Sequence, residues 1–532
     1  MAMNLLYRSL LIVLLLTVYS CGTRQAAPSQ EDRQDSIVQD TDTLLVDVME
    51  PFPDTMMPSA EKVMFKIDTF DQELSPMLSD LHDLYDNASG IFTFRGSLSR
   101  NPNFFGRLHG DTVNINVDWV FTTHSDTTHT THGVWGGGTG WTGQPLYIHW
   151  PDSLMDRMQQ PKDSLLRLSN QELVVASLCG KVYFIDFNTG NPTRMFFNAK
   201  NVLKGTPSFN PLFNGDLYIG HGVPKHNPFG HVVFNLYTEQ QTQAFGKDRT
   251  AWRGWNAYDS SPIVVGGFLF RPGENGTLYK YHVGEDSIQL HSTFRYSLSR
   301  YHSSPGIESS MAVCRNYGYL NDNAGNILCV NLNTLKPVWH YHNHDDSDAT
   351  PVVDMEDGIP YVYSGCEVDR QGATGVSYFV KLNGLTGEKI WEDTIRGRRI
   401  QFNDKKLDAG MFGSPLLGGG DCSDLIFSNF CINTLTEKGC LVAFDKHDGT
   451  IRYKTMTQQY SWSSPVAFYN DNDEMFLFTG DGAGYVYLIK GSTGEIVASK
   501  RIGSNFESSP IVVDDKIIIG SRGNKIFRIS LE

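Results

Sequence analysis

A short element recurs eight times along the chain, and this recurrence restricts the fold more than any other feature. Each copy starts with a small or polar dipeptide, usually before Pro, and continues as an apolar strand, a turn and a second apolar strand. The eight dipeptides are Gly143-Gln144, Gly205-Thr206, Ser260-Ser261, Ser309-Ser310, Ala349-Thr350, Gly413-Ser414, Ser463-Ser464 and Ser508-Ser509. Successive copies are 40 to 64 residues apart, which is enough for four short strands. A four-stranded repeat of this length predicts one blade of a β-propeller.

Eight such units predict an all-β, eight-bladed propeller of four-stranded antiparallel blades over residues 87–532. The C-terminal repeat has three strands only, which end with Lys525–Ile529. Val117–Phe121 lies before the first complete repeat and is similar to the outer strands. We therefore expect this N-terminal strand to complete the last blade and close the ring, which removes exposed sheet edges.

The repeats resemble the pyrroloquinoline-quinone (PQQ)-type β-propeller family. The resemblance rests on the Ser-Ser-Pro strand, the Gly-x-apolar-Tyr strand at Gly180–Asp186, the Thr-Gly turn at Leu385–Trp391 and the entry segment Phe94–Asn101. The quinone dehydrogenases of this kind use a vicinal disulfide, a bound calcium and a catalytic Asp. No two cysteines are adjacent in this sequence, and the calcium ligands have no evident counterpart. A shared fold does not carry an activity with it, so we expect a non-catalytic protein with no cofactor.

The N-terminus is typical of an exported lipoprotein. An apolar run from Leu10 to Leu16 is too short to span a membrane and suits a signal peptide over residues 1–20. The following Cys21-Gly22 resembles a bacterial lipobox, which implies lipidation of Cys21. Residues 21–74 are expected to form a disordered acidic tether, and residues 75–86 a short helix that starts at Ser75-Pro76.

The formal charge of −15 is unevenly distributed. Gly22–Asp86 holds 15 acidic and 4 basic residues, so this segment alone carries −11. The acidic balance argues against nucleic-acid binding, which needs a basic face. We expect a monomeric ring whose charge lies mostly outside the propeller.

Aromatic and polar residues gather in the segments that precede the repeated dipeptides, where they should surround one mouth of the central channel. These candidate binding residues are Trp135, Trp141, Trp252, Arg253, Trp255, Tyr258, Arg300, Tyr301, His302, Asp408, Phe412, Tyr460, Trp462, Phe506 and Glu507. Aromatic residues converging on a rim suit peptide or sugar recognition. The alternative is that these rings plug the channel and pack between blades. The sequence leaves both interpretations open.

Two further clusters have a chemical and a structural interpretation. His340, His342 and His344 alternate, and with Asp345, Asp346 and Asp348 nearby they could bind a divalent metal ion. An outer strand running into a polar loop is the simpler interpretation. Cys431 ends one strand and Cys440 begins the next, so they could form a disulfide in an exported protein. The alternative is a pair of buried thiols, and we expect no dedicated metal site.

A lipidated cysteine, a tether and an eight-bladed ring together resemble the propeller lipoproteins of the outer-membrane β-barrel assembly machinery. This resemblance implies a scaffold that binds other envelope proteins and faces the periplasm from the outer membrane. One alternative is a lipoprotein that binds glycan or peptide at the aromatic mouth. The other is a quinone- or metal-dependent oxidoreductase.

Overall fold

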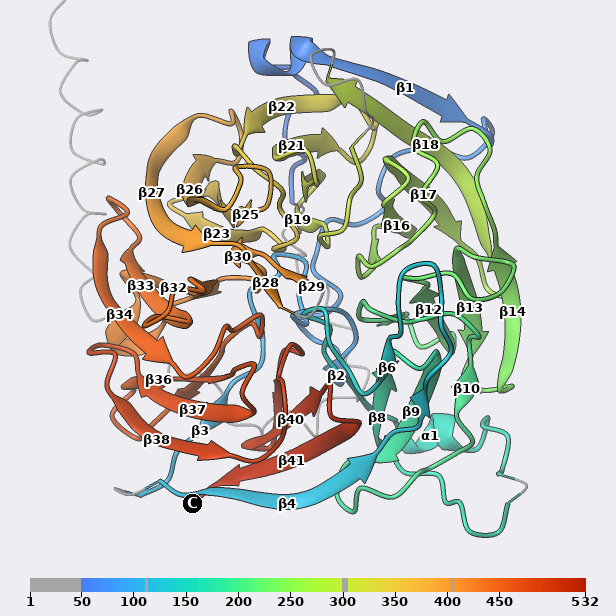
Figure 1. Cartoon of the computed structure of the whole chain (residues 1–532). Helices are drawn as coiled ribbons and strands as arrows, with labels where there is room; N and C mark the ends of the chain where they lie inside the picture. Colours follow the sequence, from blue (N-terminus) through green and yellow to red (C-terminus); the bar gives the residue numbers. More distant parts are fainter. Residues whose placement is uncertain (1–48, 111–112, 162, 299–304, 403–404) are drawn as a thin grey trace, which may run out of the picture. The chain divides into compact units, whose positions relative to one another are not determined.

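The computed structural model describes residues 49–110, 113–161, 163–298, 305–402 and 405–532. In residues 49–532, eight small antiparallel sheets surround a central axis, one sheet for each sequence repeat (Figure 1). The predicted eight-bladed propeller is therefore confirmed. Helical structure in these residues is confined to three single turns, α1 (Asp152–Met155), η2 (Pro58–Lys62) and η3 (Gly420–Cys422). No helix among the described residues has the length and apolar character needed to cross a membrane.

The first four blades follow one another along the chain. Blade 1 contains β2 (Gly90–Ile91), β7 (Leu146–His149), β8 (Gln171–Ala176), β9 (Lys181–Asp186) and β10 (Phe197–Asn198). Blade 2 contains β11 (Ser208–Phe209), β12 (Asp216–Gly220), β13 (His231–Asn235) and β14 (Gln240–Phe245). Blade 3 contains β15 (Ile263–Val265), β16 (Phe268–Gly273), β17 (Thr277–Val283), β18 (Ile288–Leu298) and the N-terminal β1 (Val63–Thr69). Blade 4 contains β19 (Ala312–Cys314), β20 (Tyr317–Asn321), β21 (Asn326–Asn331) and β22 (Pro337–His342).

The other four blades complete the ring. Blade 5 contains β23 (Val352–Glu356), β24 (Ile359–Gly365), β26 (Thr374–Asn383) and β27 (Lys389–Arg398). Blade 6 contains β31 (Leu416–Leu417), β32 (Leu425–Cys431), β33 (Gly439–Asp445) and β34 (Ile451–Thr457), and β25 (Glu367–Val368) joins it through β30 (Ala409–Gly410). Blade 7 contains β3 (Gly106–Arg107), β35 (Val466–Tyr469), β36 (Met475–Gly480), β37 (Tyr485–Lys490) and β38 (Ile496–Arg501). Blade 8 contains β39 (Ile511–Val513), β40 (Lys516–Ser521), β41 (Lys525–Leu531) and β4 (Ile115–Thr122). Two short ribbons lie outside the blades, β5 (Ser125–Asp126) with β6 (Gly136–Gly137) and β28 (Ile400–Phe402) with β29 (Lys405–Leu407).

The ring closes as the sequence predicts. β4 pairs antiparallel with β41, with Ile115 opposite Leu531 and Thr122 opposite Lys525. The N-terminal strand therefore supplies the outer strand of the C-terminal blade. Because β41 is paired with β40 and β4, the C-terminal strand is not an exposed sheet edge.

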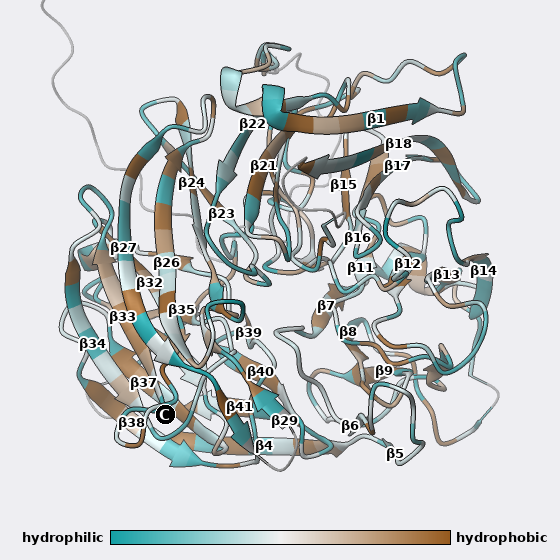
Figure 2. Ribbon diagram, turned by 45° about the horizontal axis from the view of Figure 1, so that its top comes forward, coloured by the Kyte–Doolittle hydropathy of each residue, from teal (hydrophilic) through white to brown (hydrophobic). Residues whose placement is uncertain are grey.

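Neighbouring blades stack through buried apolar residues. Figure 2 shows hydrophobic stretches along the strands of the blades. In β9, Val182 and Phe184 belong to one buried cluster, while Tyr183 and Ile185 belong to another. Successive side chains of a strand point to opposite faces, so these two clusters lie on the two sides of blade 1. This arrangement explains why the inner strands are apolar without alternation.

Hydroxyl groups of the repeated dipeptide link adjacent blades. The backbone N–H of Ser261 donates to Ser310 Oγ (2.9 Å), and that of Ser310 donates to Thr350 Oγ1 (3.0 Å). The same link joins Gln144 to Thr206, Ser414 to Ser464, and Ser464 to Ser509. A small hydroxyl residue recurs before Pro because it satisfies a buried backbone donor of the preceding blade.

Aromatic side chains of outer strands also join the blades. The Trp339 ring covers Gly387 of the next blade, and its Nε1 donates to the Gly384 carbonyl (2.8 Å). Trp391 packs on Gly449 in the same way, and Trp119 of β4 packs on Gly190. These three glycines have positive φ, which L-residues with a side chain rarely adopt, and a Cβ atom would collide with the ring.

The segment of residues 92–101 fills one end of the axis. Its backbone accepts hydrogen bonds from three different blades, at Phe209, Val313 and Val353. Arg95 and Arg100 are fully buried in this segment and donate to backbone carbonyls, including those of Pro465 (2.9 Å) and Met311 (2.8 Å). Burial lowers the pKa of Arg95 to about 9 and that of Arg100 to about 10. This end of the axis is therefore closed by a polar plug, which contains two buried arginines.

Residues 49–74 differ from the predicted tether. β1 pairs with β18 along seven residues, from Val63 opposite Leu298 to Thr69 opposite Ser292. Phe52 is buried against Tyr317, with ring centroids 5.0 Å apart. The long β18 strand would otherwise expose a row of unpaired backbone groups, so β1 covers this edge. The part of the predicted tether that precedes Met49, with the signal peptide and Cys21, lies outside the described residues.

The helix predicted over residues 75–86 is wrong. This stretch consists of bends and turns. Asp80 and Asp83 accept hydrogen bonds from the backbone N–H groups of His82 and Tyr85, both at 2.9 Å, and the backbone N–H of Leu78 donates to Asn333. Local Asp caps and tertiary partners satisfy donors that a helix would have used.

Candidate functional site at the channel mouth

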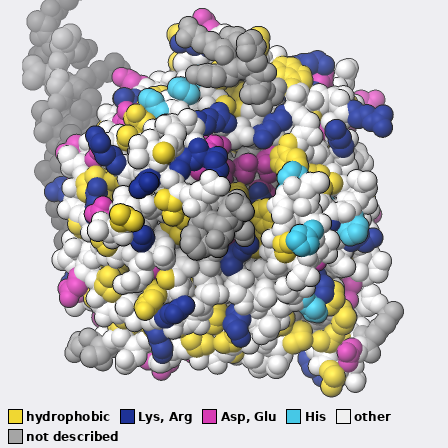
Figure 3. Space-filling model, in the orientation of Figure 1, with side chains coloured by type: hydrophobic (Ala, Val, Ile, Leu, Met, Phe, Trp, Pro, Cys, Tyr) yellow, Lys and Arg dark blue, Asp and Glu magenta, His cyan; other side chains and the backbone are white. Residues whose placement is uncertain are grey.

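One residue of each repeat, directly before the dipeptide, defines a ring around the axis. We call these residues the axial ring: Thr142, Lys204, Asp259, Glu308, Asp348, Phe412, Trp462 and Glu507. Six of the eight line a single cavity of about 20 Å³, together with Trp141 and Phe94 of the plug segment. Figure 3 shows acidic side chains in the hollow near the centre of this face, with Lys and Arg side chains around it. Four consecutive members, from Lys204 to Asp348, are charged, and the aromatic Phe412 and Trp462 follow them. Glu507 and Thr142 complete the ring.

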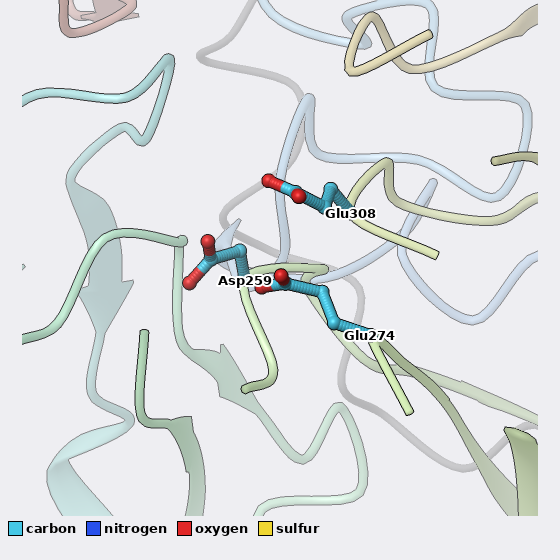
Figure 4. A group of neighbouring side chains, drawn as sticks. All are labelled: Asp259, Glu274 and Glu308. Atoms are coloured by element: carbon cyan, nitrogen blue, oxygen red, sulfur yellow. The ribbon is translucent and has the colours of Figure 1, made fainter. Parts of the chain in front are cut away.

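Three carboxylates converge on the charged side of the cavity (Figure 4). Asp259, Glu274 and Glu308 each place a carboxylate oxygen within 4.8 Å of the other two. Burial raises the pKa of Asp259, and burial together with the charges of Glu308 and Asp259 raises the pKa of Glu274 well above its ordinary value. Glu274 Oε2 accepts a hydrogen bond from Trp255 Nε1 (2.7 Å).

Lys204 neutralises this first cluster in part. Its Nζ forms an ion pair with Asp259, lies 3.8 Å from Glu308 Oε2, and sits 4.1 Å from the centre of the Trp141 ring. Burial would lower the pKa of Lys204, but the charges of Asp259, Glu308 and Glu274 outweigh burial and raise it. Lys204 is therefore a buried cation held by carboxylates and an aromatic face.

A second carboxylate cluster lies beside the first and consists of Asp346, Asp348 and Glu367. Their carboxylate oxygens also lie within 4.8 Å of one another. Burial raises the pKa of Asp348 and Glu367 well above their ordinary values, and neighbouring carboxylates add to this effect. In the described part of the chain, no Lys or Arg forms an ion pair with any of the three. Both clusters offer the oxygen ligands that hard metal ions prefer.

Aromatic rings form the opposite wall. Phe412 and Trp462 are stacked, with centroids 4.7 Å apart, and Trp462 contacts Trp141 edge-on at 5.4 Å. Trp135 and Tyr460 extend this group. Trp135, Trp141, Tyr460 and Trp462 are partly exposed, whereas Phe412 is buried. The rings therefore pack against one another and still present surface at the mouth, so both sequence interpretations apply.

The other predicted mouth residues divide into several groups. Trp255 contacts the first carboxylate cluster, Trp252 is 42% exposed, and the backbone N–H of Arg253 donates to Asn275. Asp408 forms an ion pair with Arg399, and Glu507 forms one with Arg522 (3.4 Å).

Two predicted mouth residues belong to the core instead. Tyr258 is buried against His231, and Phe506 is buried against Phe527. For these two, packing between strands determines the position of the ring. Arg300, Tyr301 and His302 lie outside the described residues.

The three alternating histidines do not converge on one point. His340 Nε2 is hydrogen-bonded to Asn326 (2.9 Å), whereas His344 stacks on Tyr378 and lies 3.5 Å from Glu392. His340 and His342 belong to β22, and His344 lies in the loop beyond it. Among the described residues, the groups able to hold a metal ion consist of carboxylates and exclude these histidines.

Cys431 and Cys440 are buried free thiols. The register places Cys431 opposite Gly439 and Cys440 opposite Phe430. A one-residue offset puts the two side chains on opposite faces of the sheet, which rules out the disulfide considered from the sequence. Cys440 packs into the cluster between blades, and Cys431 Sγ contacts the Ser461 carbonyl (3.7 Å).

Sequence analysis missed Lys204 and four of the six carboxylates, and it considered Asp346 and Asp348 only as metal ligands beside the alternating histidines. The signal was nevertheless present, because Asp259, Glu308 and Asp348 occupy the same position of three successive repeats. Aligning the repeats at the dipeptide places one residue per blade at the axis. Glu274 and Asp346 lie in loops and Glu367 begins the short strand β25, so all three are outside this register and only the structure places them beside the axial ring.

The fold and its repeats define an eight-bladed propeller of the PQQ-like kind. In sequence, the chain is similar to outer membrane protein assembly factor BamB of Yersinia pestis, with 22% identity over 302 residues that span 53% of this chain and 67% of that protein. It is also 27% identical over 94 residues to a human beta-alanine-activating enzyme, of which it covers 9%. No protein-family model matches the chain.

Solved structures share the propeller fold. A europium-containing methanol dehydrogenase has a TM-score of 0.55 and 12% identity, covering 83% of this chain and 98% of its own. A quinohemoprotein alcohol dehydrogenase from Comamonas testosteroni has the same TM-score and identity, covering 83% and 80%. BamB of Moraxella catarrhalis has a TM-score of 0.45 and 14% identity, covering 72% and 96%.

The channel mouth does not fit pyrroloquinoline quinone. The cavity of about 20 Å³ has room for one or two water molecules, whereas the quinone is a tricyclic molecule. Asp259, Glu308 and Asp348 line the cavity, and their charges would repel the carboxylates that this quinone carries. The described cysteines are all free, and none is adjacent to another in the sequence.

Proposed function

We propose that this chain is a non-catalytic, lipid-anchored scaffold of the bacterial envelope that binds other envelope proteins during outer-membrane protein assembly. The similarity to BamB over two thirds of that assembly factor carries this proposal. The signal sequence and lipobox-like Cys21 support export and anchoring, with the propeller facing the periplasm. The channel mouth supports binding, because aromatic and charged groups converge there on a rigid ring.

Affinity capture of the full-length chain tests the proposal. The protein is tagged at its C-terminus and expressed in its bacterium of origin. The cells are then cross-linked, and the tagged protein is purified in detergent. We expect a component of the β-barrel assembly machinery to be recovered in stoichiometric amount. Recovery of no envelope protein under these conditions would contradict a scaffold role.

The absence of catalysis has its own test. The purified chain is mixed with pyrroloquinoline quinone and calcium, and its absorbance and alcohol-dependent dye reduction are measured. We expect neither a bound-quinone spectrum nor dye reduction, because the cavity is small and acidic. Turnover with any primary alcohol would support the oxidoreductase alternative.

A further inference from the structure

The two carboxylate clusters at the mouth differ in whether a cation compensates their negative charge. Asp259 and Glu308 of the first cluster hold the Lys204 ammonium between them. Asp346, Asp348 and Glu367 of the second cluster have equivalent spacing, and the described residues give them no such cation. Isolated buried carboxylates are costly, so a cluster of three requires protons or a cation.

Glu367 shows that the second cluster lacks a partner. Its side chain is only 5% exposed, and its Oε1 accepts no hydrogen bond from the described residues. One carboxylate oxygen of Glu367 lies within 4.8 Å of an oxygen of Asp346 and an oxygen of Asp348, so the carboxylate is directed into the cluster. In the first cluster, Asp259 Oδ1 and Glu274 Oε1 are likewise without a hydrogen-bond partner.

Lys204 indicates which kind of cation this mouth accommodates. Its ammonium lies between carboxylates on one side and the Trp141 ring, 4.1 Å away, on the other. Asp348 lines the same cavity as the stacked rings of Phe412 and Trp462. A carboxylate and an aromatic face that line one cavity form a site for an organic cation.

We infer that the cavity between Asp348 and the Phe412–Trp462 pair binds the ammonium or guanidinium group of a basic side chain on a partner protein. This inference rests on the proposed scaffold function and specifies the chemistry of the partner, which presents a Lys or Arg at the tip of a loop. The carboxylates of Asp346 and Glu367, behind Asp348, would complement the positive charge.

A divalent metal ion is the competing occupant, and the geometry favours it less. Calcium takes six to eight oxygen ligands, and the aromatic wall offers none. An aromatic face does attract an ammonium or guanidinium group. The two occupants therefore differ in whether the Phe412 and Trp462 rings contribute to binding.

Fluorescence polarisation with a labelled peptide tests the inference. The probe is fluorescein-labelled Gly-Ser-Gly-Lys-Gly-Ser-Gly, and its matched counterpart carries norleucine in place of lysine. The protein is the full-length chain in detergent. We expect the lysine peptide to bind at least ~10-fold more tightly than the norleucine peptide, because only the former has a charge to pair.

Variants locate the site. D348N combined with E367Q should weaken lysine-peptide binding by ~10-fold or more, and W462L should weaken it several-fold. Glu495→Gln removes one exposed carboxylate on the loop between β37 and β38, which matches the charge change of D348N alone, and it should leave binding unchanged. Circular dichroism and thermal melts establish whether each variant is folded. If the double variant is not folded, the single variant D348N takes its place.

Several results would overturn the inference. Equal binding of the two peptides, or an unchanged affinity of D348N, would show that the cavity does not select a cationic side chain. Calcium binding that is abolished by E367Q and unaffected by W462L would assign the cluster to a metal ion. Failure of the scaffold proposal is distinguishable, because affinity capture would then recover no envelope protein even where the lysine peptide binds.

Discussion

At the scale of single residues, Lys204 is the buried cation of the first carboxylate cluster. It is the cation between Asp259 and Glu308, and all three belong to the axial ring. Removing one member of a buried ion pair leaves the other without compensation, which costs more than the pair itself contributes. The stability of the mouth should therefore depend on this one amine.

We expect Lys204→Met to lower the free energy of unfolding by about 3 kcal/mol, measured by urea denaturation at pH 7.5. The double variant Lys204→Met with Asp259→Asn should recover part of that loss, because the uncompensated charge is then gone. A single variant as stable as the unchanged protein would mean that the carboxylates of the first cluster are protonated in the native state.

Glu367 should make the stability of the fold depend on pH. Burial, together with Asp348 and Asp346, raises its folded-state pKa well above 4.5, so at neutral pH its ionised form destabilises the fold. As pH falls from 8 toward 4.5, the folded state takes up a proton that the unfolded state does not, and the contribution to stability rises. Glu367→Gln should remove this contribution.

We therefore expect Glu367→Gln to have a higher melting temperature than the unchanged protein at pH 8, with the difference shrinking toward pH 5. Glu495→Gln is the control, since its carboxylate is exposed, and it should follow the unchanged protein at every pH. Thermal melts from pH 5 to pH 8 measure this difference in melting temperature. A lower melting temperature for Glu367→Gln at pH 8 would indicate that a cation holds the ionised cluster.

At the scale of elements, contacts between an outer strand and the next blade set the spacing of the sheets. Trp339, Trp391 and Trp119 each cover a glycine of the following turn. Tyr453 takes the same place on Gly494, and its hydroxyl donates to the Gly491 carbonyl (2.6 Å). The Thr-Gly turn recurs in the sequence because the ring of the preceding blade leaves no room for a side chain.

The cost of the clash with the Trp339 ring can be measured by comparing the stability of Gly387→Ala with that of Gly358→Ala. Both glycines have positive φ, at 73° and 82°, but a Cβ at position 387 would lie 2.7 Å from the Trp339 ring, whereas at position 358 it would meet nothing within 4 Å. We expect a loss of about 1 kcal/mol for Gly358→Ala and about 3 kcal/mol for Gly387→Ala in urea denaturation. Equal losses would show that backbone conformation alone selects glycine.

At the scale of the whole molecule, one strand closes the ring. β4 joins residues near the start of the propeller to its last blade, and Trp119 extends from β4 to blade 1, where its Nε1 donates to the Phe187 carbonyl (3.0 Å). The closure therefore consists of a strand pairing and a contact between blades, both of which depend on residues distant in sequence.

Trp119→Ala should loosen the closure, with Trp339→Ala as the matched control because Trp339 makes the same contact between blades 4 and 5. We expect both variants to lose about 3 kcal/mol of stability. Hydrogen exchange should distinguish them: faster exchange in β4 and β41 is expected for Trp119→Ala only. Identical exchange patterns would indicate that β4 pairing is independent of its tryptophan.

The sequence by itself determined the blade count, the strand order and the closing strand, because each depends on local patterns that recur with a regular period. It did not determine the polar plug, since Arg95 and Arg100 look like loop residues until carbonyls from opposite blades surround them. The helix predicted over residues 75–86 was wrong for the same reason, because distant partners such as Asn333 satisfy its donors.

The chemistry of the mouth was decided by the tertiary structure. Asp259, Glu308 and Asp348 are 40 or more residues apart, and only ring closure brings their carboxylates to one cavity. The sequence supplied their identical position in each repeat, and the structure added Glu274, Asp346 and Glu367 from two loops and the short strand β25, which share no register. These side chains meet at the axis only when the ring closes in three dimensions. A repeat in the sequence indicates that the ring closes, but it does not specify which side chains meet there.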